Sequence, residues 1–209
     1  MVDVDGIQLV QQRPILRYVA KKTGFWPTCP AEEHLVDHIV EAYIDHREEA
    51  GGLLFIPFPE VWGGGNLVQS QQCIDKWQTD EVGASGLLVR TMPAWEKILT
   101  EGAPGIPASK APGPFFLGDR PTVADICVFE FIDYWRFMNE VLMLENGLEG
   151  EACFTLFRPF TKVMELYDAV LKLGNVRQWT REGRKRYDDM VDVRRNVADA
   201  LFGDRTLLG

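Results

Sequence analysis

The sequence predicts a mostly α protein in which a β-hairpin and one helix precede a large all-helical domain. Three observations support this fold class. An Asp-Gly turn at residues 5–6 separates two short apolar segments. A segment with one glycine and two prolines, residues 24–30, then breaks regular structure. Beyond it, apolar residues recur at helical spacing along most of the chain. We therefore expect two parts, residues 1–24 and residues 31–209.

The first predicted element is a hairpin formed by residues 1–4 and 7–10. Asp5-Gly6 suits a two-residue turn, because such a turn needs positive φ and matches the twist of the strands. Side chains alternate along a strand, so one face can carry four apolar residues: Val2, Val4, Ile7 and Leu9. A lone two-stranded ribbon is marginal in water. We expect these strands to end a larger sheet whose other strands the 209 residues do not contain.

A helix is expected directly after the hairpin, beginning near Gln11. Pro14 fits its first turn, because the N–H that proline lacks would have no partner there. The apolar residues of this helix form one stripe: Ile15, Leu16, Val19 and Ala20. Residues 24–30 are then expected to form a linker in which aromatic side chains pack locally.

The all-helical part should begin with a helix over residues 31–49, with its end softened by Gly51-Gly52. An interrupted helical segment is predicted at residues 71–99, followed by a loop with four prolines at residues 102–114. A central helix that begins near Thr122 follows this loop. After it, further helices are predicted at residues 155–173, 176–187 and 190–201.

Thr122 and Asp125 form the strongest helix start of the sequence. The Thr122 hydroxyl can accept an amide hydrogen bond while the Asp125 carboxylate reaches back to the start of the helix. Apolar residues then cover nearly the whole circumference of this helix. Such a pattern predicts a central helix that is surrounded by others.

Composition excludes several function classes. A net charge of -9 and a pI near 4.9 argue against binding to nucleic acid or to anionic membranes, which requires clustered cations. One basic run occurs, and a solvated helix face is favoured for it over a nuclear signal or a nucleic-acid patch: Arg177, Arg181, Arg184, Lys185 and Arg186. No secretory segment or apolar span of about 18 residues occurs, so a cytoplasmic location is expected.

Neither cysteines nor histidines give a metal or redox motif. The four cysteines form no CxxC pair and are expected to be reduced thiols: Cys29, Cys73, Cys127 and Cys153. His34 and His38 are four residues apart, but no third ligand follows at a suitable spacing. We therefore expect no bound metal.

The hairpin with its helix, the linker and the capped central helix together resemble the cytosolic glutathione transferase family. Residues 1–20, MVDVDGIQLVQQRPILRYVA, are similar to the last two strands and third helix of the thioredoxin-like domain of alpha-class members. Residues 118–126, GDRPTVADI, are similar to the Gly-x-x-x-Ser/Thr-x-Ala-Asp box of the helical domain. Residues 90–99 resemble the helix before that box, whereas residues 55–86 and the loop around Pro107 look like insertions.

The resemblance implies two domains and a glutathione site between strand and helix. Residues 1–24 would be part of the thioredoxin-like, glutathione-binding domain, and residues 31–209 the all-helical C-terminal domain. In the family, the γ-glutamyl end of glutathione lies at a helix N-terminus, where backbone N–H groups and the helix dipole hold an anion. The matching positions here are Gln11 and Gln12, although the second is usually Ser or Thr. On the residues alone, a polar helix start without a ligand stays open.

Asp45 and Arg90 are similar to two alpha-class positions that reach across the dimer interface to the partner's glutathione. The resemblance therefore implies a homodimer with glutathione as co-substrate and no cofactor. Asp45 lies in a charged segment, residues 37–49, so a solvated charged face is an equally open interpretation.

The family's chemistry implies a catalytic residue outside this chain. In these enzymes a Tyr, Ser or Cys near the first strand stabilises the glutathione thiolate, which attacks an electrophile. These 209 residues begin after the position that corresponds to the family's cis-proline, so they contain no counterpart of that group. Tyr18 and Tyr43 lie on helices and are not expected to replace it.

Two functions stay open at this point. The first is a glutathione S-transferase that conjugates glutathione to an apolar electrophile in detoxification. The alternative is a non-catalytic, glutathione-transferase-like binding or structural protein. The apolar edge of the hairpin favours the first, since a ribbon without neighbouring strands should carry charges or proline there. Isomerase, peroxidase and transport functions on the same fold also stay open.

Overall fold

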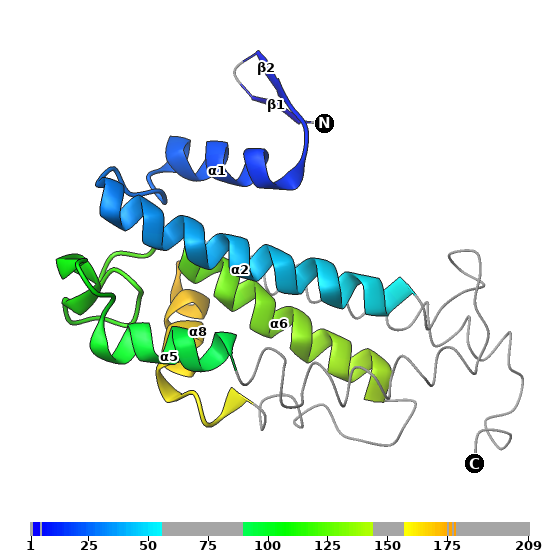
Figure 1. Cartoon of the computed structure of the whole chain (residues 1–209). Coiled ribbons are helices and arrows are strands. Elements are labelled where there is room, and N and C mark those ends of the chain that lie inside the picture. The colour runs from blue at the N-terminus through cyan, green and yellow to red at the C-terminus, as the bar shows by residue number, and fades with distance from the viewer. Residues whose placement is uncertain are drawn as a thin grey trace, which may run out of the picture.

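The computed structural model describes residues 2–4, 6–55, 90–143, 157–174, 176 and 178. Within these ranges the chain is mostly helical, with one two-stranded sheet near the N-terminus (Figure 1). Nearly all of the predicted insertion at residues 55–86 lies outside the described residues, as does the helix predicted at residues 190–201. Of the helix predicted at residues 176–187, only residues 176 and 178 are described.

The predicted hairpin is confirmed. Strand β1 (Val2–Val4) pairs with β2 (Ile7–Leu9) in antiparallel register, with Val4 opposite Ile7. Gly6 has a φ of 76° in the turn, and its N–H donates to Asp3 Oδ1 at 3.2 Å. The register puts the four apolar residues on one face, as the alternation predicts. Ile7 is 47% exposed, so this face is incompletely covered within the described structure.

Helix α1 (Gln12–Thr23) packs only lightly by apolar contact. Pro14 lies in its first turn as predicted, and Gly24, with a φ of 79°, ends the helix in the left-handed conformation. Of the predicted apolar stripe, Ala20 is buried, whereas Val19 is 41% exposed. Trp26 in the linker is buried, which confirms the local packing of that segment.

Helix α2 (Pro30–Phe55) is longer than predicted, because it continues through Gly51 and Gly52. Glycine lowers helix stability by about 1 kcal/mol relative to alanine, but it keeps its N–H group and does not clash as proline does. The two glycines therefore do not end the helix.

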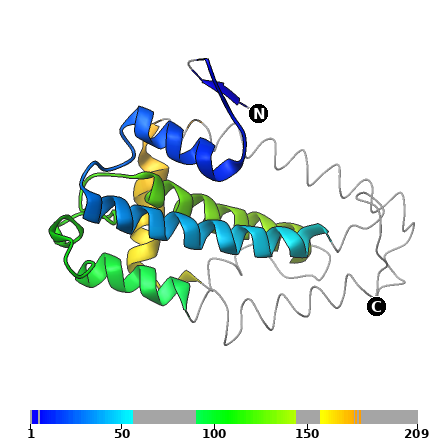
Figure 2. The same cartoon turned by 45° about the horizontal axis from the view of Figure 1, so that its top comes forward.

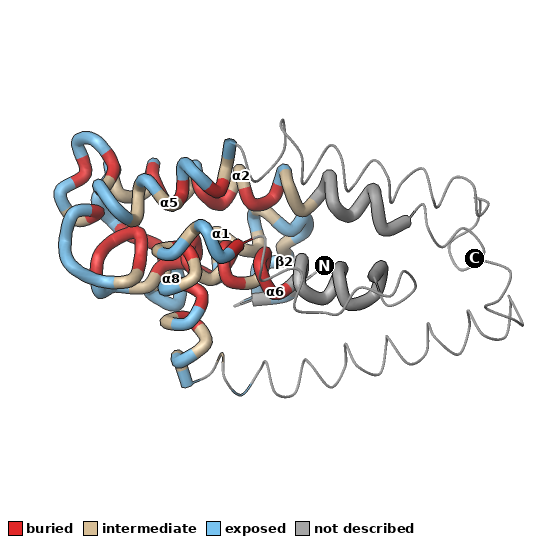
Figure 3. Tube along the Cα trace, turned by 90° about the horizontal axis from the view of Figure 1, so that it is seen from below, coloured by how far each residue is buried: buried red, intermediate tan, exposed pale blue. Residues whose placement is uncertain are grey.

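The described core is built around α6 (Val123–Met143), which lies between α2 and α8 (Thr161–Lys172), with α5 (Thr91–Glu101) beside them (Figures 1 and 2). Figure 3 shows buried residues gathered on the helices of this bundle and few of them on α1. The central position predicted for this helix is confirmed by its buried side chains: Val123, Ala124, Cys127, Val128, Phe129, Phe131 and Ile132.

Phe131 joins three helices. Its ring, fully buried on α6, makes edge contacts with Tyr43 of α2 and Trp95 of α5, with ring centroids 6.3 and 6.1 Å apart. The His46 ring of α2 lies 6.0 Å from the same ring. Edge-to-face aromatic pairs add about 1 kcal/mol to the gain from buried area. This cluster therefore fixes α2, α5 and α6 relative to one another.

Helix α8 begins at Thr161, six residues later than predicted. Pro159 explains the difference, because proline disfavours helical conformation in the residue before it and lacks an N–H. The start of α8 is capped from α5: Glu96 carboxylate oxygens accept from the backbone N–H groups of Lys162 and Val163 at 3.0 Å. The predicted loop at residues 102–114 contains a short 3-10 helix, η2 (Pro107–Lys110).

A buried carboxylate organises the start of α6. Asp125, with 0% exposure, accepts from the backbone N–H of Thr122 at 2.7 Å, which confirms the predicted reach back. The Thr122 hydroxyl also donates to Asp125, at 2.8 Å, where the sequence predicted an acceptor. The other Asp125 oxygen accepts from the N–H of Phe116 at 2.9 Å. Asp125 therefore joins the preceding loop to the helix.

We expect Asp125→Ala to lower the free energy of unfolding by about 2 to 4 kcal/mol at pH 7, because two buried backbone N–H groups and a hydroxyl lose their acceptor. Urea unfolding followed by circular dichroism measures the change. Asp168→Ala on the exposed face of α8 is the matched control and should cost less than about 0.5 kcal/mol. Equal effects of the two substitutions would contradict the assigned role of Asp125.

The same residue gives a pH dependence. Burial raises the pKa of Asp125 to about 6, although the hydrogen bonds from Phe116 and Thr122 lower it. An unfolded aspartate has a pKa of about 3.9. Because the folded pKa is the higher one, the part of the stability that is linked to protonation of Asp125 is full below about pH 4 and is lost as the pH rises through about 6. The hydrogen bonds that the carboxylate accepts remain at higher pH. Asp125→Asn removes this titration.

The advantage of the wild type over Asp125→Asn in free energy of unfolding should therefore fall by about 2 to 3 kcal/mol from pH 4 to pH 7. Urea unfolding of both proteins at several pH values gives this difference. An advantage that stays constant, or that rises with pH, would show that Asp125 does not titrate as its burial implies.

Candidate functional site

The start of α1 carries the first two candidate residues. Gln12 is the first residue of α1, and Gln11 precedes it. Gln11 has a φ of 74°, in the left-handed region that residues other than glycine rarely adopt. Its carbonyl accepts a hydrogen bond from the N–H of Ile15 at 3.3 Å. Backbone strain of this kind is concentrated at functional sites, which makes the turn before α1 a candidate for ligand binding.

The electrostatics of this helix start favour an anion. The N–H groups of Gln12 and Arg13 precede the first helical donor, and Pro14 has no N–H to offer. In the described structure no side chain caps this end, and no acidic residue lies in the first turn. Gln11 and Gln12 are both exposed. The helix dipole and the absence of an acidic residue from the first turn together suit a ligand carboxylate at this helix start.

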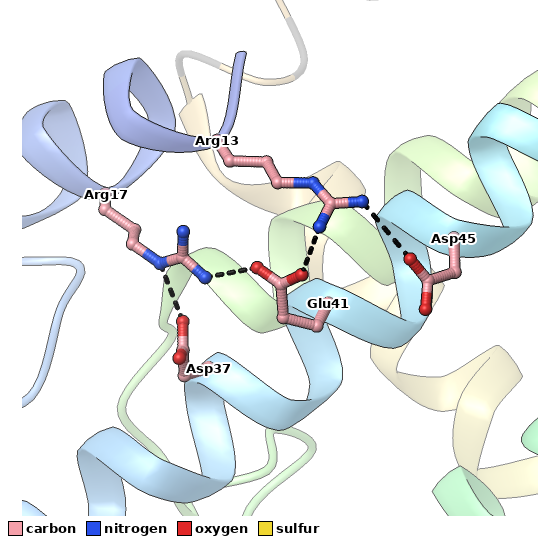
Figure 4. Close-up of polar contacts among 5 residues, drawn as sticks. All are labelled: Arg13, Arg17, Asp37, Glu41 and Asp45. Carbon is pink, nitrogen blue, oxygen red and sulfur yellow. Dashed lines mark hydrogen bonds and ion pairs between the residues drawn. The ribbon is translucent and has the colours of Figure 1, made fainter. Parts of the chain in front are cut away.

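Ion pairs attach α1 to α2 (Figure 4). Arg13 donates to Glu41 Oε2 at 2.7 Å and to Asp45 Oδ1 at 3.2 Å. Arg17 donates to Asp37 Oδ1 at 2.8 Å and also to the second oxygen of Glu41. The arginines are four residues apart on α1 and the carboxylates four apart on α2, so the two rows match. We call these five residues the α1–α2 ion-pair ladder.

The ladder changes the interpretation of the charged face predicted on α2. Asp37, Glu41 and Asp45 face α1 and pair with it, although the Asp45 side chain remains 67% exposed. The hydrogen bond that Arg17 donates to Asp37 raises the pKa of Arg17, and the bond that it donates to Glu41 adds to that effect, although burial lowers the pKa. The sequence analysis did not single out Arg13 or Arg17. Their i, i+4 spacing opposite equally spaced acids was the available signal.

Arg90 lies on the exposed surface immediately before α5. Its neighbour Thr91 shares a hydrogen bond with His46 of α2, with 2.6 Å between His46 Nε2 and Thr91 Oγ1. His46 in turn follows Asp45. The structure therefore brings together the segments that carry Asp45 and Arg90, while the contact of either residue with a partner's glutathione stays a prediction.

Several reactive groups are unsuited to thiol activation. Burial raises the pKa of Tyr43, and its hydroxyl donates to Glu130 Oε2 at 2.7 Å. Burial also raises the pKa of the Cys127 thiol, which lies within α6. The Tyr18 ring lies beneath the Lys22 ammonium, 6.0 Å from ring centroid to nitrogen. Among the described residues we assign none to activation of a thiol.

The rings of His34 and His38 lie 6.4 Å apart, centroid to centroid. Within the described ranges, no group of three or more His, Cys, Asp or Glu residues is arranged to hold a metal ion. None of the helices described is long and apolar enough to cross a membrane.

Comparison with known proteins agrees on one family. Residues 75–183, which are more than half of the chain, match the family model described as "Glutathione S-transferase, C-terminal domain". Glutathione S-transferase A2 of Mus musculus is 25% identical over 187 residues, which cover 89% of this chain and 67% of that protein. Glutathione S-transferase A of Cavia porcellus is 25% identical over 186 residues, or 89% of this chain and 68% of that protein.

Solved structures agree on the fold. A monomeric glutathione S-transferase of Necator americanus, Na-GST-3, is similar with a TM-score of 0.55 and 22% identity, over 86% of this chain and 71% of that one. Prostaglandin synthase D of Nilaparvata lugens is similar with a TM-score of 0.53 and 17% identity over the same shares. At these identities the likeness shows the fold alone.

The ladder gives a testable stability effect. Arg17→Gln should lower the free energy of unfolding by about 1 kcal/mol at low salt. A single exposed ion pair contributes less than that, but Arg17 pairs with both Asp37 and Glu41. At about 1 M NaCl most of that loss should disappear, because salt screens the wild-type pairs. Lys162→Gln, which breaks an exposed pair with Glu165 on α8, is the control. A loss for Arg17→Gln that does not depend on salt would contradict an ionic attachment of α1.

Proposed function

We propose that this chain, which belongs to the glutathione S-transferase family, binds glutathione at the N-terminus of α1 as part of a transferase. In this proposal residues 1–24 belong to the glutathione-binding domain, and residues 31–209 form the helical domain. The observation that carries it is the uncapped start of α1, with the strained Gln11, the exposed Gln12 and no acidic residue in the first turn.

The ligand's γ-glutamyl end fits this helix start. Its α-carboxylate would accept from the backbone N–H groups of Gln12 and Arg13, where the helix dipole is positive. The carboxamides of Gln11 and Gln12 would donate to the same group, and the longer Gln12 side chain would fold back to do so. Its α-ammonium requires a carboxylate, which Asp45 of the partner subunit would supply, since that side chain is largely exposed.

The proposal includes a homodimer in the cytoplasm. Asp45 and Arg90 would reach across the interface to the glutathione of the partner subunit. A carboxylate and a guanidinium together are complementary to the ammonium and carboxylate of an amino acid. Because both segments are joined through the His46 hydrogen bond, the two charges would be presented as one unit.

The reaction is conjugation of glutathione to an apolar electrophile. The glutathione thiolate donates an electron pair to the electrophilic carbon, an S–C bond forms, and the leaving group departs with its bonding pair. We assign activation of the thiol to a residue outside this chain. The 209-residue chain should therefore bind glutathione but leave the rate of its reaction with an activated aryl chloride unchanged. Acceleration of that reaction would overturn this assignment, while absence of binding would overturn the proposal itself.

A charge change at the helix start tests the binding mode. Gln12→Glu should weaken glutathione binding about tenfold, because a carboxylate at this position repels that of the ligand and competes for the N–H groups. Isothermal titration calorimetry measures the affinity.

Gln8→Glu in strand β2 makes the same change on an exposed residue four positions earlier and is the matched control. Its affinity should stay within about twofold of the wild type, because the α1 dipole acts mainly within its first turn. Equal losses of glutathione affinity in the two variants would show that the ligand's carboxylate binds elsewhere on the surface.

A further inference from the structure

One hydrogen bond connects the segments of two candidate residues that are far apart in the sequence. Asp45 and His46 are consecutive on α2, and Arg90 and Thr91 are consecutive at the start of α5. His46 Nε2 and Thr91 Oγ1 lie 2.6 Å apart. The hydrogen bond thus joins the immediate neighbours of the two charged residues. This separation is within hydrogen-bond distance.

The α2 end of this bond is anchored. His46 is half-buried, and its ring packs 6.0 Å from that of Phe131. Phe131 is fully buried and is held by edge contacts with Tyr43 and Trp95. A side chain packed against such a cluster has few accessible rotamers. His46 therefore offers Thr91 a hydrogen-bond partner at a fixed position.

The α5 end carries Arg90 on an exposed helix start. The Arg90 carbonyl accepts from the N–H of Ala94 at 3.3 Å, which is the first hydrogen bond of α5. Helix ends fray unless side chains hold them. The hydrogen bond between Thr91 and His46 holds this end against α2, beside the segment that carries Asp45. On the other side, Arg13 holds the Asp45 carboxylate.

We propose that His46 is a positioning residue, which sets the spacing between the Asp45 carboxylate and the Arg90 guanidinium through Thr91. The inference rests on the proposed function, in which these two charges bind the ammonium and carboxylate of the γ-glutamyl group. His46 does not touch the ligand. Its contribution is selectivity for the zwitterionic end of glutathione, because two opposite charges recognise such a group only at a matching separation.

The experiment compares two ligands. Glutathione carries the α-ammonium and α-carboxylate, whereas N-butanoyl-cysteinylglycine lacks both and keeps the rest of the molecule. Calorimetric dissociation constants for the two, measured on the full chain, give a selectivity ratio for the zwitterionic end. A wild-type protein without preference for glutathione would overturn the proposed function. Where the wild type does prefer glutathione, the change of this preference in the variants tests the role of His46.

Thr91→Val removes only the hydroxyl and should reduce the ratio about fivefold, the effect of one lost hydrogen bond. Thr91→Ser keeps the hydroxyl and should restore the ratio. Thr100→Val, later in α5, removes a hydroxyl that donates to its own helix at Glu96 O, and it should leave the ratio unchanged. His46→Gln and the exposed His38→Gln form a second pair with the same expected contrast.

Urea unfolding of each variant distinguishes lost positioning from lost fold, since a destabilised protein would bind both ligands more weakly by the same factor. A selectivity ratio that Thr91→Val leaves at the wild-type value would overturn the role of His46 while leaving the proposed function intact. An equal fall for Thr91→Val and Thr100→Val would also overturn it, because the effect would then be general to α5.

Discussion

The buried carboxylate of Asp125 is the contact on which the rest of the described structure depends. It satisfies the N–H of Thr122 at the start of α6 and the N–H of Phe116 in the loop before it. Helix α6 then packs against α2 and α8 and presents Phe131 to α5. The N–H of Val123, the first residue of α6, donates to Phe25 O at 2.9 Å. The start of α6 therefore also fixes the linker that follows α1.

Two kinds of force hold the two ends of α1. Its C-terminal end is tied to the core through Ala20 and the linker, where burial of apolar surface provides the stability. Its N-terminal end depends on the α1–α2 ion-pair ladder, which is partly exposed and therefore weaker and sensitive to salt. The candidate glutathione site lies at this ionic end. Its geometry is thus set by charges on α2 rather than by the apolar core.

The same arrangement connects separate parts of the candidate site. Asp45 takes part in the ladder, follows the part of α2 that packs on Phe131, and precedes His46, which holds the start of α5. A shift of α2 would move Asp45 and the Thr91 contact together. The proposed binding of the charged end of glutathione rests on two observations, the uncapped start of α1 and this connection between α2 and α5.

The sequence predicted the features that depend on local physics. The Asp-Gly turn, the reach back from Asp125 and the apolar circumference of α6 follow from turn, cap and burial rules. The first two are confirmed, and the third is confirmed for residues 123–133, where side-chain burial is described. It missed the delayed start of α8, although Pro159 was visible, and the extent of α2, where glycine is tolerated inside a long helix.

The polar contacts of the candidate site could not be predicted in the same way. The positive φ of Gln11, the pairing of Arg13 with Asp45 and the hydrogen bond between His46 and Thr91 depend on how α1 and α5 lie against α2. Local patterns do not encode such contacts between distant segments. A resemblance identified Gln11, Gln12, Asp45 and Arg90 as candidates, but it did not indicate which neighbours position them.

A crystal structure of the chain with glutathione would test the central claim most directly, namely that the start of α1 is the site for the anionic end of the ligand. We predict the γ-glutamyl α-carboxylate within hydrogen-bond distance of the backbone N–H groups of Gln12 and Arg13, where the helix dipole is positive. Glutathione bound elsewhere on the chain, with the start of α1 free of ligand, would contradict the account.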